Sequence, residues 1–272
     1  MIGGVSDFAL MGILNVTPDS FSDGGLWLDP AAAIAHGEEM VREGATIIDV
    51  GGESTRPGAA PVDEAEELRR VIPVVRELAL RLPDVVVSID TTKAAVASAA
   101  IEAGARYVND VTAFTSDPDM VHVVAAHHHV RCCLMHMQGE PRTMQADPHY
   151  GDVVADVEAY LRQRLEEIVE HGIPADRIDL DPGIGFGKRI EHNLRLMHHL
   201  DRLVAIGRPV VLGTSRKSSL ARITGRTDPA DLVAASVATS VLGYQQGVRT
   251  FRVHDVAEHH DALLVAEAIL HA

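Results

Sequence analysis

The stretch GATIID at residues 44–49 returns as GARYVN at residues 104–109 and as GVRTFR at residues 247–252. Each copy places a glycine after a helical pattern and directly before an apolar run that is typical of a β-strand. A glycine at that point supplies the left-handed backbone conformation with which many helices end. The repeat therefore indicates one type of helix-to-strand turn, used at three separate places along the chain.

Eight apolar, β-rich runs alternate with longer helical patterns from one end of the chain to the other. Their apolar residues are nearly continuous, as in parallel strands buried on both faces. The runs are 8–15, 46–50, 85–90, 106–109, 130–136, 177–181, 209–213 and 248–254. Eight such units without a compositional break predict an α/β protein of one domain, a (β/α)8 TIM barrel over residues 1–272. A doubly wound open sheet is the weaker alternative, because no Gly-x-Gly-x-x-Gly motif follows the first run.

Two of the helical patterns are clear enough to predict where a helix ends or changes. Apolar residues recur at helical spacing over residues 153–168, and Gly172 followed by Pro174 should end that helix. A second apolar stripe covers residues 68–82. Pro73 lies inside it and is expected to kink or split the helix, because proline has no N–H to donate.

The composition is that of a globular protein with a sizeable core, since 46% of the 272 residues are hydrophobic and 23% are charged. The net charge of −15 disfavours nucleic acid as a partner, although a few basic residues can still converge on an anionic substrate.

The two cysteines, Cys132 and Cys133, are adjacent, which excludes a disulfide framework and a cysteine zinc site. Residues 1–16 lack the features of a signal peptide, and no run approaches the roughly 20 apolar residues of a membrane span. We therefore expect a cytoplasmic protein without a membrane partner.

A polar residue stands at or just beyond the end of every expected strand. These residues are Asn15, Asp49, Asp90, Asn109, His136, Asp181, Ser215 and His254. In a barrel the carboxyl ends of the strands meet at one face, where active sites lie. Any one of these residues alone is explained as a helix cap, but eight in succession indicate a binding site.

The first two loops of the expected barrel carry side chains suited to a ligand. Residues 11–25 form an unusually long loop in which Phe21 stands among small polar residues, and we interpret this loop as a lid. Residues 49–58 combine glycines with Arg56, whose guanidinium can grip a carboxylate or phosphate with two hydrogen bonds. A solvated loop arginine explains Arg56 equally well when it is taken alone.

The sixth loop, DPGIGFGK at residues 181–188, superficially matches two nucleotide-binding motifs and fits neither. Lys188 is followed by Arg189 where a P-loop needs Ser or Thr, and the glycine spacing differs from the dinucleotide fingerprint. A carboxylate beside a phenylalanine suits a flat heterocycle instead. Asp181 can accept two parallel hydrogen bonds from a ring edge, and Phe186 can pack on a ring face.

Basic and hydroxyl residues follow the last two strands, where barrels frequently bind phosphate. They are Ser215, Lys217, Arg252 and His254. Arg252 and His254 stand two apart on a strand and so point the same way, which favours a polyphosphate site. The histidine runs 127–129, 198–199 and 259–260 are expected at solvated helix ends rather than at a metal, since adjacent residues do not share one helix face.

Taken together, these motifs closely resemble the dihydropteroate synthase family of pterin-binding enzymes. The matching segments are 12–25, 49–59, 88–91, 109–111, 135–145, 181–188, 213–218 and 252–256, which in order span virtually the whole chain. The resemblance implies a (β/α)8 barrel that is usually a homodimer. It also implies a reaction of folate biosynthesis that joins 6-hydroxymethyl-7,8-dihydropterin diphosphate to 4-aminobenzoate. The products are 7,8-dihydropteroate and diphosphate, and sulfonamides compete with the aminobenzoate.

The resemblance assigns a role to each residue of the expected site. The pterin ring would be held by Asp90, Asn109 and Asp181, with Met135, Phe186 and Lys217 completing the pocket. Arg252 and His254, near Ser215, would bind the diphosphate, and Asn15 would ligate its magnesium ion, Mg²⁺. The aminobenzoate site would be formed by Phe21, Thr55, Arg56, Pro57 and Ser218. The catalytic residues would be Asp90, Arg56, Lys217, Arg252 and His254.

The chemistry of the implied reaction suits these residues. An arylamine is neutral near pH 7, so no general base is needed to release the nucleophile. The barrier is cleavage of a C–O bond, which leaves cationic character on the pterin methylene and negative charge on the diphosphate. Magnesium, Arg252 and His254 would stabilise the leaving group, and carboxylates around the ring would stabilise the cation. If water is excluded from the site, it cannot capture the cation before the arylamine does.

One segment departs from the family pattern, since Thr112-Ala113-Phe114 stands where small residues, often with glycine, are expected. The departure affects the rim of the pocket and removes no catalytic group. One alternative function is that of a methyltetrahydrofolate–corrinoid methyltransferase, which has no use for a diphosphate site or for the Thr55-Arg56 loop. A second is a catalytically silent pterin-binding paralogue, against which the intact first and second loops argue.

Overall fold

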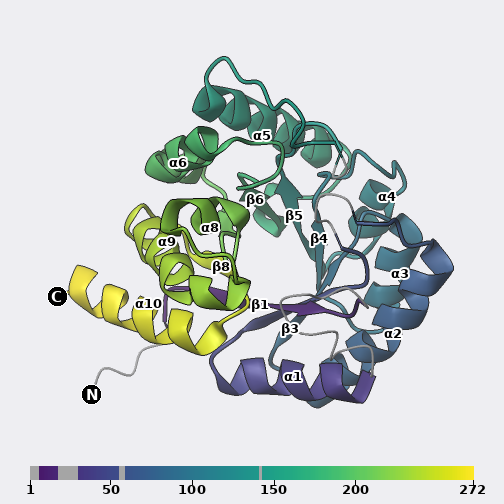
Figure 1. The fold of residues 1–272 in the computed structure, drawn as a ribbon. Helices are drawn as coiled ribbons and strands as arrows, with labels where there is room; N and C mark the ends of the chain where they lie inside the picture. The colour runs from purple at the N-terminus through teal and green to yellow at the C-terminus, as the bar shows by residue number, and fades with distance from the viewer. Residues whose placement is uncertain (1–5, 18–29, 55–58, 141–142) are drawn as a thin grey trace.

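Eight parallel strands form a barrel in the computed structural model, which describes residues 6–17, 30–54, 59–140 and 143–272 (Figure 1). The strands are β1 (Ala9–Asn15), β2 (Ile47–Gly51), β3 (Val86–Asp90), β4 (Tyr107–Asp110), β5 (Arg131–Met135), β6 (Ile178–Asp181), β7 (Val211–Leu212) and β8 (Thr250–Val253). They pair in the order β6-β5-β4-β3-β2-β1-β8-β7. A parallel bridge between Leu180 and Val210 brings the two ends of this sheet together. The predicted (β/α)8 barrel is therefore confirmed, and the open sheet is wrong.

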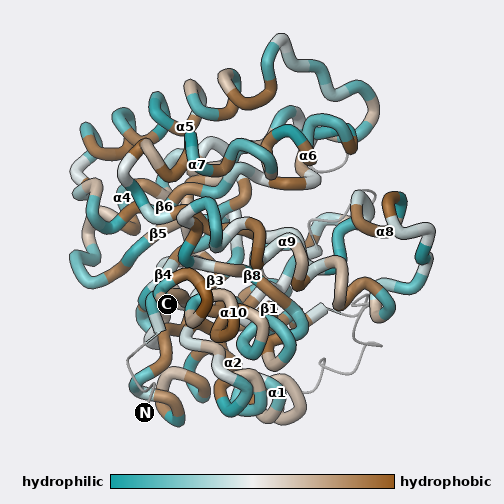
Figure 2. The backbone as a smooth tube through the Cα atoms, turned by 90° about the vertical axis from the view of Figure 1, so that its left-hand side faces the viewer, coloured by the Kyte–Doolittle hydropathy of each residue, from teal (hydrophilic) through white to brown (hydrophobic). Residues whose placement is uncertain are grey.

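Helices surround the barrel and connect successive strands (Figure 1). They are α1 (Pro30–Arg42), α2 (Glu64–Arg81), α3 (Ala94–Glu102), α4 (Met120–Ala126), α5 (Val153–Glu170), α6 (Ile190–His198), α7 (Leu200–Val204), α8 (Ser218–Thr224), α9 (Val233–Gln245) and α10 (Val256–Leu270). Hydrophobic segments concentrate toward the middle of the molecule, and hydrophilic ones lie along the outer helices and loops (Figure 2). Within the described residues, no helix is both long and apolar enough to cross a membrane.

The interior of the barrel is filled by a small apolar cluster that supports the polar residues above it. Its buried members are Met11, Ile47, Tyr107, Cys133 and Val211. Because side chains alternate along a strand, Asp49 points to the same side as Ile47, and Asn109 to the same side as Tyr107. The apolar cluster therefore forms the floor beneath polar side chains at the carboxyl ends of the strands. A much larger cluster fills the space between strands and helices.

The repeated helix-to-strand turn has the expected backbone at all three places. The angle φ is +112° at Gly44, +115° at Gly104 and +95° at Gly247, all within the range that favours glycine. Helix α5 likewise ends at the predicted position, just before Gly172 with φ at +96°. These glycines let each helix turn back and deliver the chain to the next strand.

Of the two outcomes expected at Pro73, the split is wrong, because helix α2 runs through the proline. A kink at Pro73 stays a prediction. The valines and leucine on both sides of the proline, Val71, Val74, Val75 and Leu78, are fully buried. Packing of these side chains holds both halves in one helix and offsets the hydrogen bond that the proline cannot make.

The histidine runs lie at helix ends in two of three cases. Residues 127–129 follow α4 and residues 198–199 end α6, as predicted. His259 is instead fully buried, and its Nδ1 lies 2.6 Å from the carbonyl oxygen of Asp255. The expected solvated position is wrong for His259, because it lies on the face of α10 that also buries Val256 and Leu263.

The loop after β6 passes the loop after β5 with backbone against backbone. A Cβ atom added at Gly183, where φ is +65°, would lie 1.9 Å from the carbonyl oxygen of His136. One added at Gly187, where φ is +61°, would lie 2.3 Å from the carbonyl oxygen of Gln138. Only glycine allows this approach, so the two glycines fix the height of the loop that follows Asp181.

We expect Gly183→Ala to lose clearly more stability than the roughly 1–2 kcal/mol that a left-handed alanine costs, because a backbone clash is added to the strain. Gly225→Ala is the matched control. Gly225 ends α8 with φ at +71°, and nothing lies within 4 Å of its added Cβ. Urea unfolding of both variants measures the difference, and equal losses would contradict the packing role of Gly183.

Candidate functional site

Side chains from four strands form one hydrogen-bonded group inside the mouth of the barrel. The Arg252 guanidinium in β8 donates from Nε to Asp49 in β2 and from Nη2 to Asp90 at the end of β3, each at 2.7 Å. Asn109 in β4 donates from Nδ2 to Asp49 at 2.9 Å. Burial raises the pKa of Asp90, and the charge of Arg252 opposes this shift. The structure thus brings together the predicted residues Asp90, Asn109 and Arg252.

Asp49 is the centre of this group, although the sequence analysis places it only in the ring of strand-end residues. Its side chain is fully buried, and the Ser88 hydroxyl donates to it at 2.5 Å in addition to Arg252 and Asn109. A buried carboxylate needs such partners, because an unpaired one costs several kcal/mol. The available signal for this role is one charged residue within the otherwise apolar run of β2.

The β6–β7 side of the mouth carries the predicted heterocycle residues. Asp181 Oδ1 accepts the N–H of Gly183 at 2.6 Å, and the ammonium of Lys217 lies 4.1 Å from the centre of the Phe186 ring. This is a cation–π contact. Burial lowers the pKa of Lys217 to about 8, although the negative charge of Asp181 acts to raise it. Burial raises the pKa of Asp181, and the Gly183 N–H and the Lys217 charge oppose it. Met135, also predicted, is buried, and its Cγ lies 3.3 Å from the point that a Cβ on Gly183 would occupy.

Ser215 and His254 form a second, separate pair. The Ser215 Oγ lies 3.0 Å from His254 Nδ1 and accepts the His254 backbone N–H at 3.2 Å. Arg252 reaches the aspartates instead, so its binding of one diphosphate together with His254 stays a prediction. Ser218 is exposed at the start of α8, one residue after Lys217.

Asn15 is the last residue of β1 and is half-buried at the mouth. Its side-chain amide bonds to none of the other described residues. Asn15 Oδ1 and Asp90 Oδ2 lie 3.6 and 3.7 Å from the point that a Cβ on Gly51 would occupy. Amide and carboxylate oxygens are ligands that Mg²⁺ accepts, and this ion usually takes few protein ligands together with substrate phosphates. The residues therefore fit an ion carried by a diphosphate, and across the described ranges no group of three or more His, Cys, Asp or Glu forms a protein-only metal site.

His136 does not join the other strand-end residues, so its expected place in that ring is wrong. Its ring lies edge-on to Tyr160 at 4.9 Å between centroids, and its Nδ1 is 2.9 Å from Lys188 Nζ. The buried Lys188 ammonium also donates to the carbonyl oxygens of Gly183 and Phe186. Burial lowers the pKa of Lys188 to about 7 and that of His136 to about 3, with the lysine charge adding to the latter. This pair joins the β6 loop to the β5 loop.

The segment that departs from the family pattern forms a left-handed turn after β4. The angle φ is +52° at Ala113 and +64° at Phe114, where glycine is the least strained residue. Asp110 holds the turn by accepting the N–H and hydroxyl of Thr112, both at 2.7 Å, and the N–H of Phe114 at 3.1 Å. The expected preference for small residues, often with glycine, thus follows from the left-handed backbone at this point. In this chain the hydrogen bonds of Asp110 stabilise that backbone without a glycine.

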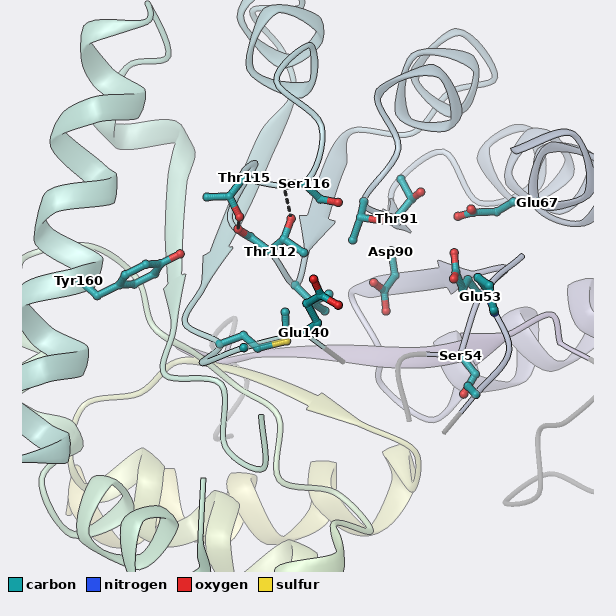
Figure 3. A pocket seen from close by; sticks show the side chains of 16 residues that line it. Glu53, Ser54, Glu67, Asp90, Thr91, Thr112, Thr115, Ser116, Glu140 and Tyr160 are labelled. Carbon is teal, nitrogen blue, oxygen red and sulfur yellow. Dashed lines mark hydrogen bonds between the residues drawn. The ribbon is translucent and has the colours of Figure 1, made fainter. Parts of the chain in front are cut away.

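A cavity of about 440 Å³ opens on the β2–β5 side of the mouth (Figure 3). Hydroxyl and carboxylate side chains dominate its lining, and Glu53, Glu67 and Asp90 contribute three of the carboxylates. Among the predicted substrate residues that the structure describes, Asp90 alone lines this cavity. The cavity therefore extends the site toward α2 and α5, which contribute Glu67 and Tyr160 to the lining. Phe21, Thr55, Arg56 and Pro57 lie outside the described residues, and their roles stay predictions.

Comparison with known proteins agrees with this arrangement. Residues 11–254 match the model of the family described as pterin binding enzyme. The dihydropteroate synthase of Escherichia coli K12 is 44% identical over 263 residues, covering 97% of this chain and 92% of the relative. Among solved structures, Yersinia pestis dihydropteroate synthase with a sulfonamide drug complex has a TM-score of 0.94 at 44% identity, covering 98% of this chain and 97% of the other. That of Xanthomonas albilineans in complex with 7,8-dihydropteroate has a TM-score of 0.88 at 43% identity, covering 98% and 96%. The chain belongs to the dihydropteroate synthase family of pterin-binding enzymes.

Proposed function

We propose that this chain joins 6-hydroxymethyl-7,8-dihydropterin diphosphate to 4-aminobenzoate, forming 7,8-dihydropteroate and diphosphate. The observation that supports this most directly is the polar group in the mouth. Asp90, Asn109 and Asp181 stand at the ends of three strands beside the cations Arg252 and Lys217. Carboxylates and an amide in a dry pocket complement the donors and acceptors at the edge of a pterin ring.

The pterin would lie between the two sides of the mouth. Asp181 keeps acceptor capacity after bonding to Gly183, because each carboxylate oxygen accepts more than one hydrogen bond. It faces the ring edge, while Asn109 supplies both a donor and an acceptor. Phe186 packs on a face of the pterin ring, and the Lys217 ammonium lies over the Phe186 ring. These residues are carried by strands and by the loop that Gly183 fixes, so the pocket is formed before the ligand arrives.

The diphosphate would lie toward Arg252, His254 and Asn15. Two of the five guanidinium N–H groups of Arg252 are used by Asp49 and Asp90, which leaves others for a phosphate oxygen. His254, positioned by Ser215, adds a donor. A magnesium ion bound with the diphosphate, with Asn15 as one ligand, would offset negative charge on the leaving group. These donors stabilise the charge that develops as the C–O bond breaks.

The arylamine would then attack the pterin methylene carbon, and its departing proton passes to solvent or diphosphate without a protein base. Asp90 and Asp181 place negative charge beside the electron-poor ring in this step. The 4-aminobenzoate would lie outside the pterin, near Ser218 and the second loop. The corrinoid methyltransferase alternative gives no role to the Arg252–His254 side of the mouth.

We also propose that the chain is a cytoplasmic homodimer. Support for the dimer comes from exposed apolar residues on the neighbouring helices α9 and α10, namely Leu242, Leu264, Val265, Ile269 and Leu270. Exposed apolar side chains on helices that contact each other are typical of an interface. Analytical ultracentrifugation of the purified chain tests this, and a monomer at micromolar concentration would contradict it.

Diphosphate release from the pterin diphosphate, measured with and without 4-aminobenzoate, tests the proposed reaction. We expect release to depend on the arylamine and to match the dihydropteroate formed one to one. A silent paralogue would bind the pterin without releasing diphosphate, and that result would overturn the proposal.

Asp181→Asn is expected to weaken binding of a pterin analogue by about 1.5–3 kcal/mol, the effect of losing a charged acceptor. Asp179→Asn is the control, because Asp179 lies two residues earlier on β6 and bonds to Tyr107 and Arg131 on the floor side. The control should lower stability without changing affinity. Calorimetry and thermal unfolding of both variants separate the two effects, and equal affinities would contradict the role of Asp181.

The lowered pKa of Lys217, about 8, leads to a pH prediction. The ammonium form is the one that binds the anionic substrate, and it is lost as the pH rises through 8. We therefore expect kcat/KM for the pterin diphosphate to fall above this pH. Lys217→Arg keeps the charge at all accessible pH values and should abolish this fall, even where its absolute rate is lower. An unchanged alkaline limb in the variant would assign the titration to another group.

A further inference from the structure

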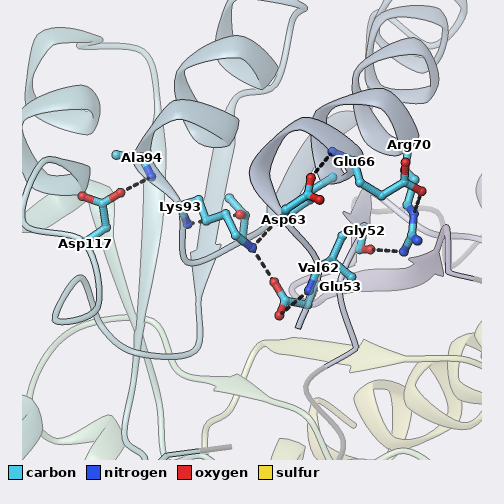
Figure 4. A network of polar contacts seen from close by, with 11 residues as sticks. Gly52, Glu53, Val62, Asp63, Glu66, Arg70, Lys93, Ala94 and Asp117 are labelled. Atoms are coloured by element: carbon cyan, nitrogen blue, oxygen red, sulfur yellow. Dashed lines mark hydrogen bonds and ion pairs between the residues drawn. The ribbon is translucent and has the colours of Figure 1, made fainter. Parts of the chain in front are cut away.

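The side chain of Lys93, between β3 and α3, joins two other parts of the chain (Figure 4). Its ammonium donates to the carboxylate of Glu53, just after β2, and to that of Glu67 in α2, the latter at 2.5 Å. The backbone N–H of Lys93 is itself fixed by the Thr91 hydroxyl at 3.2 Å. The ammonium is therefore held at a defined point three residues beyond Asp90.

Glu53 connects this ammonium to both ends of the second loop. Its second carboxylate oxygen accepts the backbone N–H of Val62 at 3.3 Å, which ties residue 53 to residue 62 across residues 54–61. Arg70 of α2 donates to the carbonyl oxygen of Gly52, the residue before Glu53, at 3.0 Å. Contacts from α2 and from Lys93 thus set the position from which the loop leaves the barrel.

Loss of the Lys93 ammonium would leave the buried carboxylate of Glu67 without its cation. Its side chain is fully buried, and one of its carboxylate oxygens has no hydrogen-bond partner in the part of the chain that the structure describes. Lys93 is the cation that offsets its charge. Burial lowers the pKa of Lys93, but the hydrogen bonds to Glu53 and Glu67 outweigh this and raise it. About a quarter of the Lys93 and Glu53 side chains is exposed, so solvent screens this pair less than a surface pair.

We infer that Lys93 is a positioning residue for the second substrate: by bridging Glu53 and Glu67, it fixes Glu53 and, through it, Val62, the two residues that flank the second loop. The inference rests on the proposed function, in which this loop contributes to the aminobenzoate site. The strand-borne pterin residues do not depend on the bridge. Its loss should therefore affect the two substrates unequally.

Glu53→Gln is the primary test, because it removes the negative charge of the Glu53 carboxylate and leaves the buried Lys93–Glu67 pair intact. We expect KM for 4-aminobenzoate to rise about tenfold, as for loss of one charge-assisted hydrogen bond. KM for the pterin diphosphate should stay close to that of the unmodified enzyme. Calorimetric titration of 4-aminobenzoate, with a pterin analogue and diphosphate present, should show the same loss of affinity.

Lys93→Met and Lys93→Arg test the lysine itself. The methionine has a similar length without charge, and we expect it to shift the same KM as Glu53→Gln. In KM for 4-aminobenzoate, the double variant should be little worse than either single one, because both changes remove the Lys93–Glu53 interaction. Lys93→Met also removes the pair with Glu67, and this additional loss should appear in stability. Arginine restores a cation and should recover most of the aminobenzoate affinity. Thermal unfolding identifies any variant whose loss reflects poor folding.

Glu77→Gln is the matched control, since Glu77 lies on the same helix as Glu67 and pairs with Arg81 at the surface. It should change neither KM. A parallel rise of both KM values in Glu53→Gln, or no change in either, would overturn the positioning role. Absence of aminobenzoate-dependent diphosphate release by the unmodified enzyme would instead overturn the proposed function, so the two failures are distinguishable.

Discussion

The guanidinium of Arg252, held between Asp49 and Asp90, is the contact on which the rest of the mouth depends. It reaches from β8 past β1 to β2 and β3, and so connects strands that are not all neighbours in the sheet. Breaking a buried ion pair by removing one partner costs about 3–5 kcal/mol, because the remaining charge is left without compensation. The two aspartates and the arginine therefore hold one another in place, which fixes the position of the guanidinium in the mouth.

Much of this architecture is predictable because barrel strands have a simple pattern. The run 85–90 becomes β3 at Val86–Asp90, since nearly continuous apolar residues suit a strand that is covered on both faces. The run 177–181 becomes β6 at Ile178–Asp181 although it carries Asp179, whose charge is paired with Arg131. A charged residue at the end of such a run, such as Asp90 or Asp181, must find partners at the mouth. Position along the strand therefore predicts membership of the site, without indicating which partner each residue takes.

Features that depend on tertiary contacts were beyond this kind of prediction. Packing on both sides of Pro73 keeps α2 whole, and the burial of His259 follows from the face that α10 presents to the core. Lys188 lies 52 residues from His136 in sequence and Lys93 lies 40 from Glu53, so local patterns carry no signal for either contact. The role of Asp49 as the centre of a hydrogen-bonded group is also set by partners distant in sequence, Asn109 and Arg252.

The two sides of the mouth differ in how their charges are supported, and this difference has a functional consequence. Asp49, Asp90 and Asp181 are carried by strands, and each lies close to a cation that also comes from a strand or the loop directly after it. Gly52 and Glu53, which lead into the second loop, are held by Arg70 of α2 and by Lys93. A pocket built on strands can bind its ligand before the outer loop is placed. For the proposed reaction, we therefore expect the pterin diphosphate to bind first and the arylamine to bind second.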